Sequence, residues 1–596
     1  MRSIRRYAVY LACAALALLI LNHYKYRFAS TTRRPTEPSS TISKTHADES
    51  FRWESVNVDY PVQSLTPLPT AQPNRLPRVQ FNFPAESEET SSIRKTRLDA
   101  VKTAFGRCWN SYRKHAWMHD ELAPISGSYK DTFGGWAANM VDNLDSLWII
   151  GFKDEFDVAV EAIMDIDLSK HTEGEINVFE TTIRHLGGLL SAYDLSGDDR
   201  LLEKAKEFGE MLLKAFDTPN RMPITRWDPV TARRGPQQAD DVVLVAEIGS
   251  LSMEFTRLSQ VTGDARWYDA VERIVAVFDE QQRDTHLPGM WPVVVNARDK
   301  DFTQDTMFTL SAMSDSLYEY FPKMHALLGG VEPVYKKLYD DSMATAIKHN
   351  LWRPMTPENV DILISGNVRA KDRRSARLDP QGQHLVCFAG GMFALGGKLF
   401  NEPAHVEIGQ KLADGCIYAY KALPLGIMPE DFHMVPCESR EGCMWDDNKW
   451  KEEVEVRSGG SFTADEIIAN SRLPPGFTEI SDRRYILRPE AIESVFILYR
   501  ITGEQYLQDA AWDMFNAIIN ATETPLANAA LRDVTYSKTQ IAEGKGLKPI
   551  KMDSMESFWM AETLKYFFLM FSEPDVISLD EWVFNTEAHP FKRRLP

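Results

Sequence analysis

The chain has 596 residues, which is enough for a large core or for several domains, and 44% of them are hydrophobic. The formal net charge of −18 at pH 7 argues against a nucleic-acid-binding protein, because such proteins normally carry a basic surface. The 14 Trp, 20 Tyr and 30 Phe residues suit neutral sugars or cations as ligands without establishing either.

The N-terminus has the pattern of a membrane-directed segment. Arg2, Arg5 and Arg6 precede an uncharged run that covers residues 7–24. A cleaved signal peptide has a similar pattern, but no clear cleavage site of small residues follows, so an uncleaved signal anchor is favoured. Basic residues stay on the cytosolic side, and therefore residues 1–6 are expected in the cytosol and the remainder in the lumen. The short span suits the thinner membranes of the early secretory pathway, the endoplasmic reticulum or Golgi.

A change in composition separates the anchor from the rest of the chain. Residues 25–92 are rich in Pro, Ser and Thr and have little hydrophobic periodicity, which predicts a mostly disordered stem. Helical periodicity begins near Ile93, so residues 93–596 are expected to form the folded body. Within that body, residues 437–481 form a polar insertion whose effect on access cannot be derived from the sequence.

The body repeats one local pattern. Around Gly197, Gly263 and Gly503, an apolar helix ends at Ser/Thr-Gly, an acidic residue follows, and a second amphipathic helix begins. Short connections of this kind make antiparallel helical hairpins, and residues 400–423 are a looser copy. Several hairpins indicate a closed ring of helix pairs or an open solenoid. The irregular spacing favours an all-α toroid with a central cavity.

The stretch NVFETTIRHLGGLL, residues 177–190, has the apolar periodicity of a buried helix. Glu180 and Arg184 lie four residues apart and share a face, with Gly187 on the same side. A surface ion pair is the simple explanation. However, Gly187 and Gly188 each cost about 1 kcal/mol in a helix interior, which a solvated face would not require. The pattern therefore indicates a face that a ligand or another backbone approaches closely.

Further acids occupy similar positions, each with a simpler explanation when taken alone. Glu490 and Glu493 share a face at the start of a predicted helix, where acids also suit the helix dipole. Glu562 lies in an aromatic stripe, with Lys565 as a simple ion-pair partner. Asp315 stands beside a Ser and a Glu in capping-box spacing, so helix-start chemistry is an alternative there.

His384 and Glu430 complete this set. A lone His before an apolar run is usually a satisfied structural group, and Glu430 follows a Pro, a combination common at helix starts. Taken together, the acids at the ends and inner faces of apolar helices exceed what capping requires. Glycoside hydrolysis needs paired carboxyl groups with separated pKa values, and polar and aromatic groups for the sugar. Hard oxygen ligands also suit Ca²⁺.

Eight ordered motifs make residues 98–590 resemble the class I α-1,2-mannosidases, glycoside hydrolase family 47. They are VDNLDSLWIIGF, VFETTIRHLGGLLSAYDLSGD, SDSLYEYFPK, HLVCFAGG, GIMPEDFH, LRPEAIESVFILYRITG, MESFWMAETLKYFFLMFS and VFNTEAHPF. The resemblance implies an (α/α)7 barrel, in agreement with the predicted hairpins, and a β-hairpin plug that the composition does not show. It also implies inverting hydrolysis of terminal α-1,2-linked mannose from high-mannose N-glycans, with bound Ca²⁺.

The resemblance assigns catalytic roles to residues that match the family's motifs. Glu180 matches the acid that protonates the departing glycosidic oxygen through a water, and Arg184 would orient it. Asp315 and Glu490 match the two other central carboxylates, either of which could activate the attacking water; Glu490 is favoured as the base. Glu430 matches a further active-site acid.

The resemblance also implies binding roles. The residues that match contacts to the terminal mannose or its water shell are Glu247, His384, Glu493, Phe558 and Glu562. Thr586 matches the residue that binds Ca²⁺ through its hydroxyl and carbonyl oxygens. The other Ca²⁺ ligands in the family are waters and sugar hydroxyls, so no acid-rich Ca²⁺ loop is expected.

The cysteines of the body are odd in number, which leaves one unpaired. Cys437 and Cys443 flank a short loop and could pair locally. Cys387 and Cys416 match the disulfide of the family, and the partner of Cys108 stays open. Paired cysteines fit a lumenal body.

The chain departs from the family pattern at residues 311–315, SAMSD, where the endoplasmic-reticulum members read Gly-Ala-Arg-Ala-Asp. The Arg of that pattern helps to choose which oligosaccharide branch enters. Met313 therefore implies broader, Golgi-like trimming instead of a single-linkage specificity.

Two other functions remain as alternatives. One is a degradation-enhancing relative that acts weakly on misfolded glycoproteins, although its usual long C-terminal extension is absent. The other is a mannose-binding lectin that kept the barrel and lost catalysis, which the presence of Glu180, Asp315 and Glu490 argues against. The expected partners are high-mannose N-glycans and the membrane, with no nucleic acid, and a monomer is expected.

Overall fold

The computed structural model describes residues 51–460, 462–546 and 550–596. The contact pattern divides the chain into Met1–Phe51 and Arg52–Pro596, and the second unit is described below. The predicted cytosolic tail, the anchor over residues 7–24 and the first part of the stem lie outside the described residues. Within the described ranges, no helix combines the length and the apolar character needed to cross a membrane.

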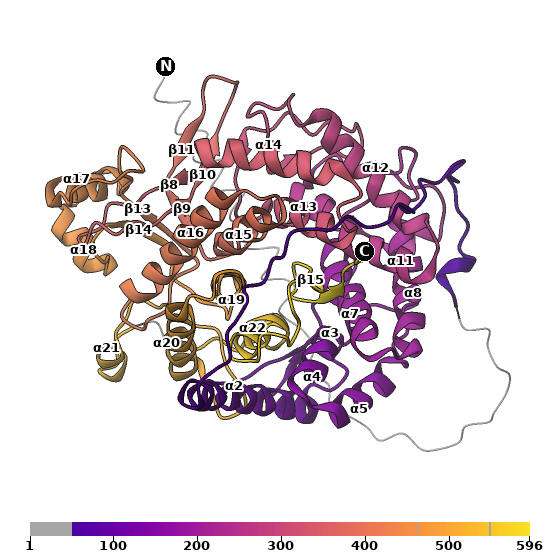
Figure 1. Ribbon diagram of the computed structural model, residues 1–596, viewed down its shortest axis with the longest axis horizontal. Helices are drawn as coiled ribbons and strands as arrows, with labels where there is room; N and C mark the ends of the chain where they lie inside the picture. Colours follow the sequence, from indigo (N-terminus) through magenta and orange to yellow (C-terminus); the bar gives the residue numbers. More distant parts are fainter. Residues whose placement is uncertain (1–50, 461, 547–549) are drawn as a thin grey trace, which may run out of the picture. The chain divides into compact units, whose positions relative to one another are not determined.

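A closed ring of inner helices forms the centre of this unit (Figure 1). In ring order these helices are α4 (Leu144–Ile150), α7 (Gly187–Ser196), α11 (Ser252–Thr262), α13 (Asp315–Leu327), α15 (Ala389–Leu399), α19 (Glu490–Thr502) and α22 (Lys565–Met570). Each packs against the next, and α22 packs against α4, so the ring closes. The predicted toroid is therefore confirmed, and the open solenoid is wrong.

An outer helix covers each inner helix. The outer helices are α5 (Lys153–Ile163), α8 (Asp199–Leu213), α12 (Arg266–Gln281), α14 (Pro333–His349), α16 (Pro403–Ala422), α20 (Gln505–Thr522) and α2 (Glu88–His115). The first six follow their inner partners as hairpins, whereas α2 packs against α22 from the opposite end of the sequence. The described residues thus form seven pairs, one for each inner helix named above, an (α/α)7 barrel.

The hairpin turns have the predicted chemistry. Gly197, Gly263 and Gly503 are the C-cap residues of α7, α11 and α19, with φ angles of 71°, 77° and 74° that favour glycine. Asp198 then accepts a hydrogen bond from the Arg200 backbone N–H and caps α8. These turns fix the antiparallel course of consecutive helices, which brings the inner-helix N-termini to one end of the barrel.

The loops carry short helices and strands. The helices are η1 (Trp53–Ser55), α3 (Ala138–Asp142), α6 (Val178–Glu180), η2 (Thr181–Leu186), η3 (Lys214–Phe216), α9 (Pro229–Ala232), α10 (Val245–Gly249), η4 (Leu385–Phe388), α21 (Lys538–Ala542) and η5 (Trp559–Leu564). The strands are β1 (Glu121–Leu122), β2 (Tyr129–Lys130), β3 (Ile176–Asn177), β4 (Arg226–Trp227), β5 (Val243–Leu244), β6 (Val294–Val295), β7 (Met307–Phe308), β8 (Leu351–Trp352), β9 (Ile364–Ser365), β10 (Asn367–Arg369), β11 (Arg377–Asp379), β12 (Gln381–Gln383), β13 (Asp431–Met434) and β14 (Phe477–Asp482). Strands β12, β13 and β14 form an antiparallel sheet in that order.

A final β-hairpin enters the barrel. Strands β15 (Trp582–Phe584) and β16 (Pro590–Lys592) pair antiparallel, with β15 against α13 and β16 against α7, and Figure 1 shows β15 within the ring. His589 in the connecting turn bonds to Asp142 Oδ1 at 3.1 Å and to Asp145 Oδ2 at 2.8 Å. The turn is therefore fixed to α3 and α4, and this hairpin is the plug that the composition did not show.

The two glycines of α7 permit this insertion. A Cβ at Gly187 would lie 2.8 Å from Asn585 Nδ2 and 2.9 Å from His589 Cδ2. A Cβ at Gly188 would lie 2.6 Å from the carbonyl oxygen of Val141. The close approach predicted from the sequence is thus made by other parts of the chain, and any larger residue at these positions would displace the plug or α3.

Residues 52–83 correct the expectation of a mostly disordered stem. They run in an extended path along the body, and Trp53 and Val79 are buried. Backbone N–H groups of residues 59, 60, 66 and 79 donate to the carboxylates of Asp217, Asp269 and Asp580 at 2.7–2.9 Å. Since the partners of this segment are side chains of the distant body, its own composition could not reveal that it is ordered.

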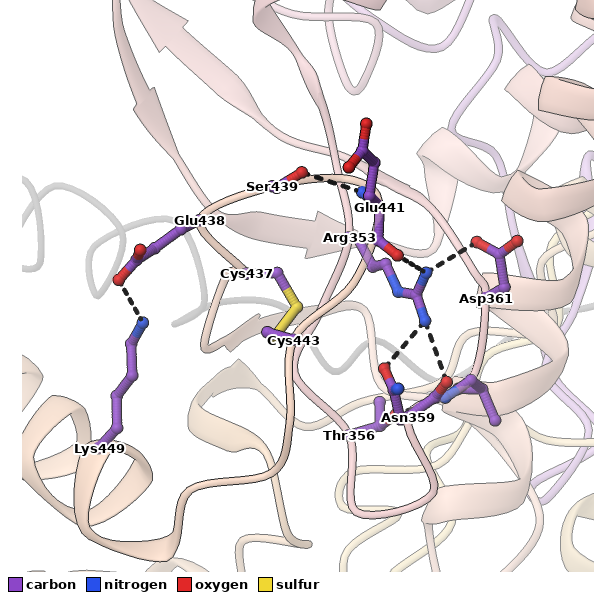
Figure 2. The surroundings of a disulfide bond; sticks show 11 residues. Arg353, Thr356, Asn359, Asp361, Cys437, Glu438, Ser439, Glu441, Cys443 and Lys449 are labelled. Atoms are coloured by element: carbon purple, nitrogen blue, oxygen red, sulfur yellow. Dashed lines mark hydrogen bonds and ion pairs between the residues drawn. A yellow bond between two sulfur atoms is a disulfide. The ribbon is translucent and has the colours of Figure 1, made fainter.

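The polar insertion contains α17 (Asp447–Arg457) and α18 (Ala464–Ser471). It begins with a disulfide between Cys437 and Cys443, which confirms the local pairing that the sequence allowed (Figure 2). Arg353 holds the disulfide loop to the body, because its guanidinium donates to the Glu441 carbonyl at 3.1 Å and to Asp361 Oδ1 at 3.2 Å.

The second disulfide joins two elements of the barrel. Cys387 in η4 and Cys416 in α16 are bonded, as the resemblance implied. This link ties the start of α15 to the outer helix that covers it. Within the described residues, Cys108 is buried and forms no disulfide.

Candidate active site

A cavity of about 330 Å³ opens at the barrel end where the inner helices α13 and α19 begin. The predicted site residues that line it are Glu180, Arg184, Glu247, Met313, Asp315, Glu490, Glu493, Phe558, Glu562 and Thr586. The fold therefore brings together side chains from the starts of α13 and α19, from the short helices α6, η2, α10 and η5, from a loop and from the tip of the plug.

Two π-helical turns carry acids of this cavity. Glu180 ends α6, and the Asn177 side chain accepts its backbone N–H at 3.2 Å before the chain continues into η2, a π-helix. Glu562 lies within η5, a second π-helix. A π-helical turn widens the backbone and re-aims side chains, and such turns are frequent at functional sites. The apolar periodicity alone predicted a regular α-helix at both places.

Arg184 connects the acids around it. Its Nε donates to Glu180 Oε2 at 2.9 Å, and its Nη1 donates to Glu587 and, at 3.2 Å, to Ser557 Oγ. The same Nη1 lies 3.6 Å from Asp142 Oδ2. Arg184 is only 6% exposed, so the surface-pair explanation is wrong: this guanidinium is a buried hub that sets the direction of the Glu180 carboxyl group.

Glu490 is held in its charged form. It is the first residue of α19, and its Oε2 lies 2.8 Å from His384 Nδ1. Burial favours the neutral form, but the hydrogen bond from His384 and the charge of Arg488 outweigh it and keep the pKa of Glu490 below its usual value. Glu490 is therefore ionised at neutral pH.

Asp315, at the start of α13, shows the opposite behaviour. Desolvation, together with the nearby charges of Glu319 and Glu490, raises the pKa of Asp315 to about 7. Glu319 pairs with Lys323, and α13 has no side-chain cap in the part of the chain that the structure describes, so helix capping does not account for these acids. Two facing carboxyl groups with separated pKa values are the arrangement that acid–base chemistry needs.

Three more acids crowd the floor of the cavity around Thr586. Glu493, Glu562 and Glu587 are 5%, 5% and 3% exposed. Desolvation and then the charges of neighbouring acids raise the pKa of Glu562 well above its usual value, and burial raises those of Glu493 and Glu587 against the pull of a nearby cation. The cationic side chains near the floor are therefore too few to balance the negative charge that these carboxyl groups would carry.

The floor residues fit a bound Ca²⁺. Thr586 lines the cavity at the tip of the plug, and its backbone N–H donates to Tyr320 Oη at 3.3 Å. Ca²⁺ takes hard oxygen ligands, which the Thr586 oxygens and the carboxylates of the floor could supply directly or through water. Within the described ranges, no cluster of three or more His, Cys, Asp or Glu side chains has metal-ligating geometry.

Glu430 and His384 lie behind the cavity wall instead of on it. Glu430 is 8% exposed and accepts hydrogen bonds from Arg488 Nε at 2.5 Å and from the Ile486 N–H at 3.1 Å. His384 is fully buried, with its second ring nitrogen 2.7 Å from Tyr420 Oη. In the described residues, Glu430 supports Arg488 and His384 supports Glu490, and neither is among the residues that line the cavity.

The lining residues that the sequence interpretation missed include three charged side chains that pair with assigned residues. Arg488 and Glu587 lie inside the quoted motifs, within two positions of the assigned residues Glu490 and Thr586, so their motifs carried a usable signal. Arg226, whose Nη2 lies 2.5 Å from Glu247 Oε1, is in a short strand within an irregular segment and gave no signal.

Met313 stands at the mouth of the cavity. It is 51% exposed, and its φ of 72° places an ordinary side chain in a conformation that favours glycine. Its carbonyl accepts the Ala246 N–H at 3.0 Å, which fixes this backbone beside Glu247. A residue held in this way presents its side chain to whatever enters the cavity.

Comparison with known proteins identifies the family. The sequence profile of glycosyl hydrolase family 47 matches residues 104–593. The chain belongs to this family. A solved family structure, "alpha-1,2-mannosidase from Trichoderma reesei", matches with a TM-score of 0.72 and 31% identity, covering 84% of this chain and 99% of that chain. The (α/α)7 barrel described above is thus the family fold.

Relatives within family 47 share one named activity. The endoplasmic reticulum mannosyl-oligosaccharide 1,2-alpha-mannosidase of Homo sapiens is 34% identical over 512 residues, 85% of this chain. The chain spans 65% of the length of that human relative. The mannosyl-oligosaccharide alpha-1,2-mannosidase of Penicillium citrinum is 31% identical over 516 residues, which cover 83% of this chain and 92% of the relative.

Proposed function

We propose that this chain is an inverting glycosidase that removes terminal α-1,2-linked mannose from high-mannose N-glycans. The observation that carries the proposal is the pair of central carboxyl groups, Glu490 and Asp315, whose pKa values are moved in opposite directions within one cavity. The activity named for the family-47 relatives supports the same reaction.

Glu180 is proposed as the general acid. Its side chain is 27% exposed, more than those of Glu490, Glu493 and Glu587, so a water has room beside its carboxyl group. Arg184 fixes one carboxyl oxygen and turns the group toward the cavity. A proton passed from Glu180 through that water to the glycosidic oxygen would assist departure of the remaining oligosaccharide.

Glu490 is proposed as the general base. It is ionised, and His384 fixes the direction of its Oε2. An ionised carboxylate can take a proton from the water that attacks the anomeric carbon on the face opposite the leaving group. Asp315 is the alternative base, but with a pKa of about 7 it is largely protonated at mildly acidic pH, so we assign it a hydrogen bond to substrate or water.

Ca²⁺ is proposed as the cofactor. The oxygens of Thr586 would bind it, with Glu493, Glu562 and Glu587 holding its water shell. When bound, the ion would supply positive charge to the crowded floor and bind hydroxyls of the terminal mannose. The acids of the floor then orient those hydroxyls, and Phe558 offers an aromatic face to the sugar.

Location and specificity are proposed from the sequence. Residues 7–24 would anchor the protein as a type II single-pass membrane protein of the endoplasmic reticulum or Golgi, with residues 25–51 as the stem and the barrel in the lumen as a monomer. Met313 would allow broader trimming than a single linkage, because it adds no hydrogen-bond donor at the mouth of the cavity.

Release of free mannose from a nine-mannose N-glycan tests the proposal. Wild-type protein should release mannose, and both a Ca²⁺ chelator and the Glu490→Gln substitution should stop the release. Binding of the glycan without release at any Ca²⁺ concentration would instead indicate the lectin. Release from a misfolded glycoprotein but not from the free glycan would indicate the degradation-enhancing type.

A further inference from the structure

The turn that carries Thr586 is closed by the side chain of Asn585. The Asn585 Oδ1 accepts the backbone N–H groups of Glu587 at 2.9 Å and of His589 at 2.8 Å. Its Nδ2 donates to the Ile183 carbonyl at 3.2 Å and to Glu254 Oε1 at 2.7 Å. The side chain therefore needs an acceptor on the barrel wall to keep the turn in one orientation.

Glu254, on α11, supplies that acceptor and is connected to the turn by two hydrogen-bonded routes. The same Oε1 accepts the Tyr320 hydroxyl at 2.7 Å, and Tyr320 Oη in turn accepts the Thr586 N–H at 3.3 Å. Glu254 thus holds Asn585 directly and Thr586 through Tyr320. Gly187 makes room for the contact, because a Cβ there would lie 2.8 Å from Asn585 Nδ2 and 3.7 Å from Glu254 Cγ.

Packing alone does not explain an acid at this position. Glu254 is fully buried, and its Oε2 has no hydrogen-bond partner among the described residues. Desolvation raises the pKa of Glu254 to about 7. A Gln would make the same two hydrogen bonds through its oxygen without the cost of a buried carboxylate. The difference between the two side chains is that Glu254 can ionise, and a cation bound at the neighbouring turn would favour its charged form.

We propose that Glu254 is a positioning residue for Thr586, which orients the Thr586 oxygens through Asn585 and Tyr320 and adds negative charge beside them. The proposal rests on the proposed function for the identity of the cation at Thr586. Side chains that hold the ligands of a metal, without touching the metal, typically change its affinity by about 10–100-fold when they are substituted.

Calorimetric titration of the Ca²⁺-free full-length protein with CaCl2 tests this role. Glu254→Gln should weaken the affinity for Ca²⁺ by about 10-fold, while the thermal midpoint of the Ca²⁺-free protein stays the same or rises. Tyr320→Phe removes both hydrogen bonds of the Tyr320 hydroxyl, to Glu254 and from the Thr586 N–H, but leaves the contact between Glu254 and Asn585, so it should weaken the affinity less. In Glu254→Gln, kcat at saturating Ca²⁺ should return toward the wild-type value.

Glu272→Gln is the matched control. Glu272 Oε1 accepts the Tyr335 hydroxyl at 2.7 Å, and burial raises the pKa of Glu272 to about 7. Glu272 therefore resembles Glu254 in its tyrosine partner and its raised pKa, but it has no contact with the turn that carries Thr586 among its described hydrogen bonds. This control should leave the Ca²⁺ affinity unchanged. Equal effects of both substitutions, or a Glu254→Gln protein that binds Ca²⁺ as tightly as wild type, would overturn the positioning role alone. A wild-type protein without a Ca²⁺ site would overturn the cofactor part of the proposed function and this proposal with it.

Discussion

Glu490 and Glu493 lie three residues apart on the same inner helix and have opposite electrostatic environments. At the entrance of the cavity, His384 and Arg488 keep the pKa of Glu490 below its usual value. One turn deeper, Glu493 lies 3.6 Å from Lys323, yet burial and the charges of Glu319 and Glu490 raise its pKa well above the usual value. The helix is the same for both acids, so the neighbours decide which one is ionised.

This difference separates two tasks within one cavity. The entrance acids Glu180, Asp315 and Glu490 each have individual partners that set a direction or a protonation state, as proton transfer requires. The floor acids share too few cations, as is suited to a site that is completed by a bound ion. Substitutions at the entrance should therefore change turnover, and substitutions at the floor should change metal affinity.

The largest effect is expected at the entrance acid Glu180. Glu180→Gln should lower kcat by about 10²–10⁴-fold, because the amide cannot donate the proton. Glycan binding, Ca²⁺ affinity and the thermal midpoint should stay close to wild type, since Gln keeps the shape and accepts the Arg184 hydrogen bond. Discontinuous assays of mannose release measure kcat, and calorimetric titration with the glycan measures its binding. Near-normal turnover would remove Glu180 from the acid role.

Substitution at the floor should act on the ion instead. Chelation should abolish activity and lower the thermal midpoint, and added Ca²⁺ should restore both, because an ion that binds only the folded state stabilises it by mass action. Thr586→Val keeps the shape and the main-chain carbonyl but removes the hydroxyl, so the affinity for Ca²⁺ should fall without gross unfolding. Calorimetric titration of the Ca²⁺-free protein is the measurement. An unchanged affinity in Thr586→Val would contradict the placement of the ion.

The entrance pair also predicts a pH dependence that separates the two candidate bases. If Glu490 is the base and protonated Asp315 binds substrate or water, kcat/KM should fall as the pH rises through about 7, the pKa of Asp315. Asp315→Asn should remove that upper limb. A kcat/KM that rises through the same pH would instead assign the base to Asp315.

The raised pKa of Asp315 also predicts the direction in which the stability of the protein changes with pH. Its folded-state pKa is raised above the value in the unfolded chain, so its proton stabilises the fold at acidic pH. That contribution is lost as the pH rises through about 7. The thermal midpoint of wild type should therefore decline relative to that of Asp315→Asn between about pH 4 and pH 7, which scanning calorimetry at several pH values checks.

The smallest effect is expected from substitution of Met313, at the mouth of the cavity. Met313→Arg adds up to five hydrogen-bond donors where substrate enters and should narrow the choice of branch, with Ca²⁺ affinity unchanged. Chromatographic separation of the isomers made from a nine-mannose glycan checks this. The same isomer pattern in both proteins would exclude Met313 from branch selection.

Local chemistry made the helical hairpins predictable. Gly197, Gly263 and Gly503 end their helices because a glycine adopts positive φ easily, a property of one residue and its immediate neighbours. The ring follows from repeating such turns. The plug was not predictable in this way, because β15 and β16 are short and the buried partners of their turn, such as Asp142, Glu254 and Tyr320, are distant in the sequence.

The sequence also could not show which of the predicted site residues face the cavity. The motifs placed His384 and Glu430 correctly in the region of the site, but which side chain faces the cavity depends on tertiary packing against Tyr420 and Arg488. The order of residues 52–83 depends in the same way on carboxylates of the distant body, such as Asp580. Composition describes a segment by itself and gives no information on such partners.

Proton NMR of the first mannose released from an α-1,2-linked substrate shows whether the anomeric centre is inverted or retained. A base at Glu490 that activates water on the face opposite the leaving group must invert the anomeric centre. We therefore expect that β-mannose appears first and converts to the α-anomer only by later mutarotation. Initial release of α-mannose, or no release by the Ca²⁺-loaded protein, would contradict it.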